Sequence, residues 1–173
     1  MLYWKRRSRV QTTRQIRICG VNEMNSKADI IAALTSKNNK FACAYAENII
    51  SESHETDTWY DCFYEFAALL NHSNSLVRNR ALFILAANAQ WDDENRFDDI
   101  MSEYLLHITD EKPITARQCI KALAEVGQAK SQLIPKILEA LYDADLSCYK
   151  ESMRSLIEKD INATIRMLKN PSL

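Results

Sequence analysis

The apolar residues of this chain recur at helical spacing over most of its length. From Ser26 onwards they fall three or four positions apart, in segments separated by short polar stretches. Ser26 is placed to cap a first helix through Leu34, and the next segment predicts a helix over residues 37–51. The 173 residues include only 2 Gly and 3 Pro, so the turn-forming residues of an all-β fold are missing. The pattern therefore predicts an all-α fold.

The segment 75–90 is the most apolar of the chain. Ten of its residues are apolar and they point to all sides of the predicted helix: Leu76, Val77, Ala81, Leu82, Phe83, Ile84, Leu85, Ala86, Ala87 and Ala89. A helix that is apolar on nearly all sides is buried on nearly all sides. We expect it to be the central helix.

Capping residues predict the remaining boundaries. A helix opens at 57–58 and runs to about 70, and the acidic residues 92–94 precede a helix that runs to 106–107. Pro113 lies in the first turn of a helix that we expect to end near Gly127, as a C′ residue. Ser131 precedes a helix to residue 142, with Pro135 in or near its first turn. The last helix is expected over about 148–169.

An internal repeat is centred on three arginines. The segment that begins Val77-Arg78 aligns with Ala116-Arg117 and again with Met153-Arg154, so the arginines are 39 and 37 residues apart. A period near 40 with two helices per period is typical of HEAT and armadillo arrays. One hairpin cannot bury its apolar face alone, so each stacks on the next.

These segments resemble the HEAT-repeat (armadillo-like) superfamily, whose second helix opens with an apolar-Arg pair followed by a small apolar residue. The resemblance covers about residues 37–169. More narrowly, residues 78–92 and 112–123 are similar to small bacterial HEAT-repeat proteins often labelled "SufBD-like", after an iron–sulfur assembly system. The resemblance implies a right-handed α-solenoid of about three to four helical hairpins, and no established catalytic residues.

Charge divides the chain into a basic leader and an acidic body. Residues 1–23 carry six basic side chains against Glu23, whereas residues 24–173 carry 16 basic and 22 acidic ones. The leader is open to three interpretations: a basic tail that touches nucleic acid or an anionic surface, an organellar targeting peptide, or a segment upstream of a native start at Met24. We favour the third and treat 24–173 as one domain. A nucleic-acid stripe is not expected on the acidic body.

The five cysteines predict a cytoplasmic setting. Their number is odd and none forms a CxxC pair, which is typical of reduced thiols. Cys43, Cys62 and Cys119 are expected in the core as small apolar residues. No apolar run approaches the roughly 20 residues that span a bilayer.

The repeated arginines Arg78, Arg117 and Arg154 have two interpretations. They could form a cationic ladder that grips an acidic peptide or a phosphate. Alternatively, each guanidinium binds carbonyls or carboxylates of a neighbouring hairpin turn, where Asp110, Glu111, Asp143 and Asp145 are suitable partners. We favour the structural interpretation.

Four residues are the candidates for partner binding. Leu82 and Phe83 could form an apolar patch on the inner face, and their equivalents in the next repeat are Lys121 and Ala122. Trp91 is either an anchor for the partner or a plug in the seam between hairpins. Complete burial of Leu82 and Phe83 is the alternative.

The sequence offers no group of residues typical of catalysis. His54, His72 and His107 are isolated, so no metal site is expected. Cys62 and His72 are expected at opposite ends of a helix, too far apart for nucleophilic catalysis. Gly20 and Gly127 are the only glycines, which excludes a Gly-rich phosphate loop. We therefore expect no catalytic residue, no cofactor and no metal.

The sequence as a whole favours a non-catalytic scaffold or adaptor that binds a protein or peptide on the inner face of a short solenoid. Two alternatives involve nucleic acid. Trp91, Asp92 and Asp93 loosely resemble the centre of HEAT-like DNA alkylation repair glycosylases, although the acidic body opposes this. The other is binding through basic residues 5–17 of the tail.

Overall fold

The helices lie in two layers that run side by side. The computed structural model describes residues 26–170, and these contain eight α-helices and no strand. The prediction of an all-α chain is therefore confirmed for this part. The predictions about residues 1–23 and the start at Met24 lie outside the described residues.

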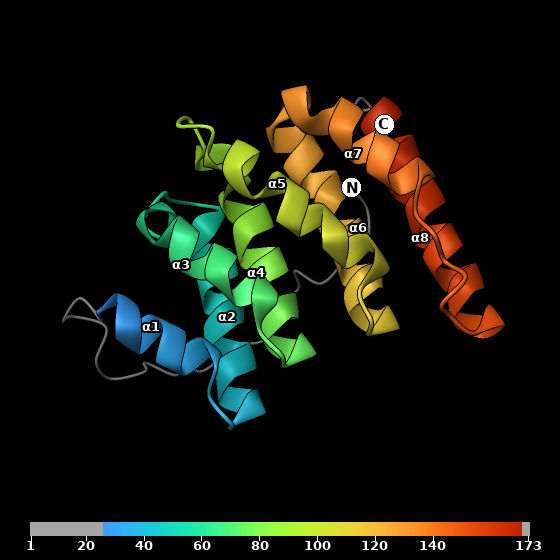
Figure 1. Cartoon of the computed structure of the whole chain (residues 1–173). Helices are drawn as coiled ribbons and strands as arrows, with labels where there is room; N and C mark the ends of the chain where they lie inside the picture. The colour runs from blue at the N-terminus through green and yellow to red at the C-terminus, as the bar shows by residue number, and fades with distance from the viewer. Residues whose placement is uncertain (1–25, 171–173) are drawn as a thin grey trace, which may run out of the picture.

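One layer consists of α2 (Asn39–Ser53), α4 (Ser75–Asn88), α6 (Pro113–Ala129) and α8 (Glu151–Lys169). Neighbours in this order pack on one another, α2 on α4, α4 on α6 and α6 on α8. All four run in the same direction, with their N-terminal ends at the lower edge of Figure 1. We call it the inner layer.

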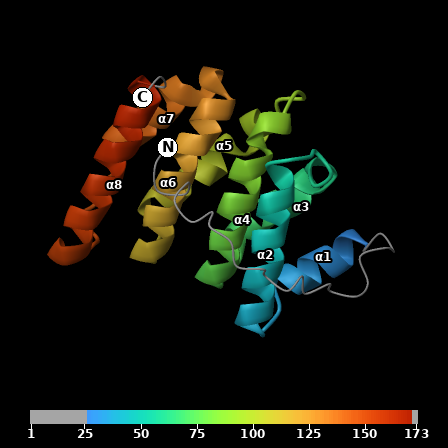
Figure 2. The same cartoon turned by 180° about the vertical axis from the view of Figure 1, so that it is seen from behind.

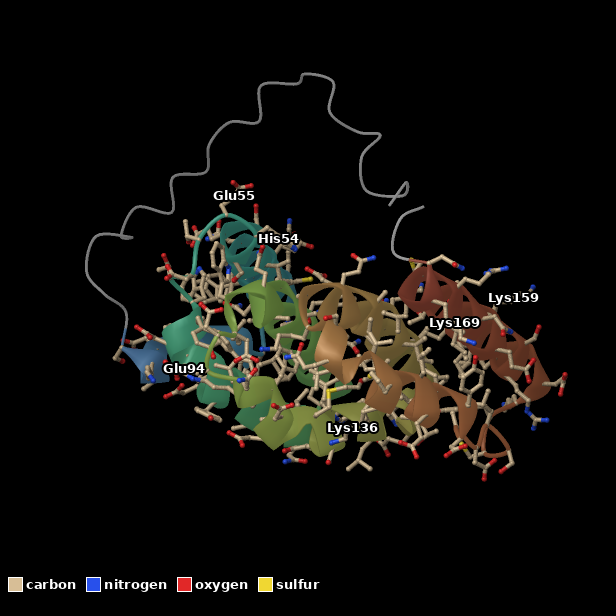
Figure 3. All side chains as sticks on the ribbon, turned by 90° about the horizontal axis from the view of Figure 1, so that it is seen from above. His54, Glu55, Glu94, Lys136, Lys159 and Lys169 are labelled. Atoms are coloured by element: carbon tan, nitrogen blue, oxygen red, sulfur yellow. The ribbon has the colours of Figure 1, made fainter. Side chains whose placement is uncertain are left out.

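The other layer is formed by α3 (Phe63–Ala68), α5 (Arg96–Leu106) and α7 (Ile134–Tyr142), while α1 (Lys27–Leu34) lies at the N-terminal end of the array. Figure 2 shows the molecule from the side opposite to that of Figure 1, so that the inner helices α2, α4 and α6 face the viewer. The view along the helices in Figure 3 separates the two layers, with His54 and Glu55 on the inner side and Lys136 on the outer side. We call this second layer the outer layer.

Caps hold several helices where the sequence predicted them. Ser26 forms a capping box with Asp29, because its Oγ accepts from the Asp29 N–H and the Asp29 carboxylate accepts from the Ser26 N–H. Pro113 is the first residue of α6, and Pro135 lies in the first turn of α7. These predictions are confirmed.

The central helix of the prediction is α4. Ten of its fourteen residues are buried, including Arg78, Arg80 and Asn88. It packs on α2, α3 and α6, so its apolar residues find partners in both layers. The core continues through α6 to α8, where the Thr164 hydroxyl donates to the Ile120 carbonyl at 3.0 Å.

The prediction that Gly127 is the C′ residue of α6 is wrong, although the helix ends only two residues beyond it. The helix continues to Ala129, and Gly127 is buried inside it. A Cβ atom at this position would lie 2.4 Å from Leu168 Cδ2, so glycine lets α8 approach α6 closely. In the sequence alone, a glycine that allows two helices to pack closely cannot be told apart from a glycine that ends a helix.

Three further expectations need correction. Cys43 is exposed, although Cys62 and Cys119 are buried as predicted. The last helix begins at Glu151 and not near Cys148, because residues 143–150 form a separate connection. The segment expected to open at 57–58 instead begins with a 3₁₀ turn at Tyr60–Cys62 before α3.

Candidate protein-binding surface

Phe83 and Lys121 occupy equivalent positions on neighbouring inner helices. Each is the ninth residue of its helix, Phe83 in α4 and Lys121 in α6. Phe83 is partly buried against the core, and the side chain of Lys121 is 47% exposed. Phe83 and Lys121 therefore both reach the surface, on adjacent inner helices.

The prediction that Leu82 lies on the surface is wrong, because the residue has no exposed area. Its carbonyl accepts a hydrogen bond of 2.8 Å from the hydroxyl of Tyr104 in α5, so it faces the outer layer. The alignment on the arginines paired Leu82 with Lys121. Counting from the start of each helix pairs Phe83 with Lys121 instead, because Arg117 lies one residue deeper in α6 than Arg78 in α4.

The surroundings of Lys121 carry a small positive excess. Arg117 Nε lies 2.5 Å from Asp160 Oδ2 of α8, and Lys121 Nζ lies 3.8 Å from the other oxygen of the same carboxylate. Two cations thus share one anion at the junction of α6 and α8. Because Lys121 is half exposed, its ammonium group is accessible to a carboxylate of a binding partner.

The inner side is polar further along the helices. The imidazole Nε2 of His54, at the end of α2, lies 2.8 Å from Glu125 Oε1 of α6. This contact links two helices that are separated by α4, and both side chains are nearly half exposed.

Trp91 lies in the seam between the ends of α2 and α4. Its Nε1–H donates to the Ser53 carbonyl at 2.7 Å, and Gln90 donates to the same carbonyl at 2.9 Å. Asn88 donates to the Ser53 hydroxyl at 2.9 Å. The polar atom of Trp91 is therefore used within the chain, and its ring packs on the core.

Arg78 connects α4 to the turn before α6. Its Nε and Nη2 donate to the two oxygens of Asp110 at 2.8 and 2.7 Å, and its Nη1 donates to the carbonyls of His72 and Ser73. The Asp110 hydrogen bond raises the pKa of Arg78 against the opposing effect of burial. This bidentate geometry leaves no free side of the guanidinium for a ligand.

Asp110 is the acceptor at the centre of this cluster. Burial alone would raise the pKa of its carboxyl, but hydrogen bonds from Arg78, the Lys112 backbone N–H and His107 outweigh burial and lower the pKa. The Tyr149 hydroxyl donates to the Asp110 carbonyl at 2.5 Å, which attaches the connection before α8 to the same turn. Asp110 thus joins three hairpins.

The other two repeated arginines lie at matching places. Arg117 is bound to Asp160 of α8, and Arg154 donates to the carbonyls of Ser147 and Tyr149 at 3.4 and 3.3 Å. Each of the three lies in the second turn from the start of α4, α6 or α8. Arg78 and Arg154 are each the fourth residue of their helix and Arg117 is the fifth, so the three lie at a similar level of successive inner helices, and each one contacts a turn or a helix of the array.

Arg80 was missed in the sequence because it does not recur. It is buried, and its Nη1 donates to the Leu34 carbonyl at 2.8 Å, while Nη2 bonds the Asn39 side chain. Burial lowers its pKa. Two arginines of α4 thus hold the neighbouring turns on either side, Arg80 towards α1 and α2 and Arg78 towards α6.

Asp92 is a structural residue in this arrangement. It is 2% exposed and accepts from the Tyr60 hydroxyl, the backbone N–H groups of Arg96 and Phe97, and Lys130. Burial opposes ionisation, but these hydrogen bonds outweigh it and lower the pKa of Asp92. Its carboxylate therefore caps α5 and is not open to a nucleic-acid substrate.

The histidines lie apart from one another. His54 pairs with Glu125, His107 Nδ1 lies 2.9 Å from Asp110, and the His72 ring accepts from the Asn74 N–H. Within residues 26–170, no group of three His, Cys, Asp or Glu side chains has the geometry of a metal site. Cys62 and His72 flank the α3 segment at its two ends.

Comparisons with known proteins return no family, no curated relative and no solved structure that matches this chain. Among the helices of the described residues, none combines the length and the apolar character needed to cross a bilayer.

Proposed function

We propose that this chain is a short HEAT-like α-solenoid that serves as a scaffold or adaptor and binds a segment of another protein on its inner layer. The observation that carries the proposal is the row of parallel helices α2, α4, α6 and α8, with Arg78, Arg117 and Arg154 at matching turns. Such rows present an extended surface of regularly spaced side chains, which suits elongated partners.

The proposed contact residues are Phe83 and Lys121. An apolar side chain of the partner packs on the partly exposed ring of Phe83, and a partner carboxylate pairs with the Lys121 ammonium. Trp91 and the arginines support the surface from within the chain, because their polar atoms already have partners. The proposed partner segment is therefore apolar with at least one acidic residue.

A cytoplasmic location forms part of the proposal. All four cysteines of the described residues have free thiols, and two of them, Cys43 and Cys148, are exposed. Exposed free thiols persist in reducing compartments.

The proposal is tested by affinity purification of the full chain from its native cell, comparing the wild type with Phe83→Ala/Lys121→Glu. The matched control is Tyr64→Ala/Lys136→Glu, which removes the same kinds of side chain from exposed positions of the outer layer. We expect one stoichiometric partner with the wild type and the control, and its loss with the inner-layer variant. Equal recovery by all three proteins would contradict the proposed site.

A further inference from the structure

A shallow apolar groove lies in the outer layer between the ends of α5 and α7. Its volume is about 490 Å³, which lies within the usual range for binding pockets. The apolar lining comes from Leu105, Leu106, Ile108, Ala140 and Ala144, and the rim from Ser102, Thr109, Asp143, Asp145 and Cys148. Leu106 is 70% exposed, the highest value among the large apolar residues of the described chain.

The groove lies in the most acidic part of the molecule. Residues 92–111 contain eight acidic side chains and a single basic one, Arg96. Six of the eight are at least partly exposed along α5 and its flanks: Asp93, Glu94, Asp98, Asp99, Glu103 and Glu111. Of these, Asp99 and Glu103 accept from Tyr64 and Asn71 on the α3 side, whereas Asp143 and Asp145 lie on the rim opposite α5, with Lys136 as a neighbouring cation beside Ser102. The carboxylates on this rim favour a basic ligand.

The walls of the groove are fixed by contacts within the chain. Tyr149, next to Cys148, is anchored through its hydroxyl to the Asp110 carbonyl. The Asp145 carboxylate accepts from the Ser147 N–H at 2.9 Å, and Lys136 Nζ lies 3.2 Å from Ser102 Oγ. The groove is therefore preformed, and a ligand does not have to order these segments.

We propose that this groove binds a basic amphipathic helix of a second protein. Apolar residues spaced three or four apart enter the groove over Leu105 and Leu106, and lysine or arginine side chains face Asp143, Asp145 and the acidic surface of α5. Charge complementarity selects this occupant, because an acidic or neutral segment would leave the carboxylates unpaired. The site is separate from Phe83 and Lys121, which lie on the inner layer.

The test uses fluorescence anisotropy of a labelled synthetic peptide of Leu and Lys, patterned as an amphipathic helix of about five turns. The full chain is expected to bind it, and Leu106→Gln is expected to weaken binding about tenfold, the loss of one apolar anchor. Asp143→Asn/Asp145→Asn is expected to weaken binding about threefold at low salt and to flatten its salt dependence.

The matched control is Ile114→Gln, an apolar residue that is 54% exposed outside the groove. It should leave the affinity unchanged, as should Phe83→Ala/Lys121→Glu, so failure of the inner-layer site is distinguishable from failure of the groove. A Lys/Leu peptide of scrambled order that binds equally well would overturn the groove in favour of unspecific charge attraction.

Two other occupants are separated by the same experiment. If a chain that starts at Met24 binds the peptide and the full chain does not, the basic residues 1–23 occupy the groove and the proposal of a second protein is overturned. Binding that disappears as the chain dimerises with increasing protein concentration would assign the groove to a second copy and equally overturn it.

Discussion

The ion pair between Arg78 and Asp110 should contribute a large part of the stability, and its removal is the sharpest test of the repeat contacts. The side chains are 8% and 3% exposed, and the Asp110 carboxylate also accepts from His107 and the Lys112 N–H. Asp110→Ala would leave a buried guanidinium without its two strongest acceptors. Breaking one partner of such a pair costs about 3–5 kcal/mol.

A loss of this size is a substantial share of the roughly 5–15 kcal/mol that a domain gains on folding. At about 2–4 °C per kcal/mol for a chain of this length, we expect Tm to fall by roughly 6–20 °C. Urea unfolding followed by far-UV circular dichroism measures the free energy directly. Glu151→Ala, which removes the exposed partner of Arg154, is the control and should change it by at most about 0.5 kcal/mol.

A double-mutant cycle separates the pair from its surroundings. Arg78→Met/Asp110→Ala should cost less than the sum of the two single changes by about 2 kcal/mol, because the double variant leaves no unpaired buried charge. A cost below about 1 kcal/mol for Asp110→Ala, or strict additivity in the cycle, would refute the assignment of Arg78 as a connector between hairpins.

Three further predictions concern acid unfolding, the packing of Gly127 against Leu168, and the reactivity of the cysteines. Because the pKa values of Asp92 and Asp110 are lowered in the folded chain, their stabilising effect is present above the unfolded carboxyl pKa of about 4 and is lost as the pH falls through the lower folded values. Asp110→Asn removes the contribution of Asp110 already at neutral pH, so its acid unfolding midpoint should shift to higher pH, and an unchanged midpoint would contradict this. In Gly127→Ala the clash with Leu168 should offset the roughly 1 kcal/mol that alanine gains over glycine within a helix, whereas the same change in a Leu168→Ala background should stabilise by about that amount; equal effects on the urea midpoint in both backgrounds would disprove the contact. Among the cysteines of residues 26–170, a thiol reagent should modify Cys43 and Cys148 rapidly, because they are exposed, and Cys62 and Cys119 only on unfolding, because they are buried. Rapid modification of Cys62 or Cys119 would argue against the packing of the core.

The sequence predicts the helices well because their signals are local. Capping at Ser26, the prolines in the first turns of α6 and α7, and the all-round apolar pattern of α4 each depend on a few neighbouring residues. The prediction for Gly127 is wrong because the role of this glycine is not local. It depends on contact with Leu168, which lies 41 positions away in the sequence.

The candidate surface is harder to predict than the helices. Leu82 and Phe83 are adjacent and both apolar, and only the packing of the neighbouring helices around α4 decides that Leu82 is buried while Phe83 is partly exposed. Arg78 is the fourth residue of α4 and Arg117 is the fifth residue of α6, so an alignment on these arginines pairs the following residues one position out of step. The groove over Leu106 requires the relative placement of α5 and α7, which no pattern within either helix encodes.

The most direct test of partner binding on the inner layer is site-specific photo-crosslinking in the native cell. A photoreactive phenylalanine analogue replaces Phe83 in one version of the full chain and Tyr64, an exposed aromatic residue of the outer layer, in another. The proposed function predicts one dominant crosslinked protein from position 83, absent from position 64 and abolished by Lys121→Glu. Identical crosslinks from both positions, or none from position 83, would contradict it.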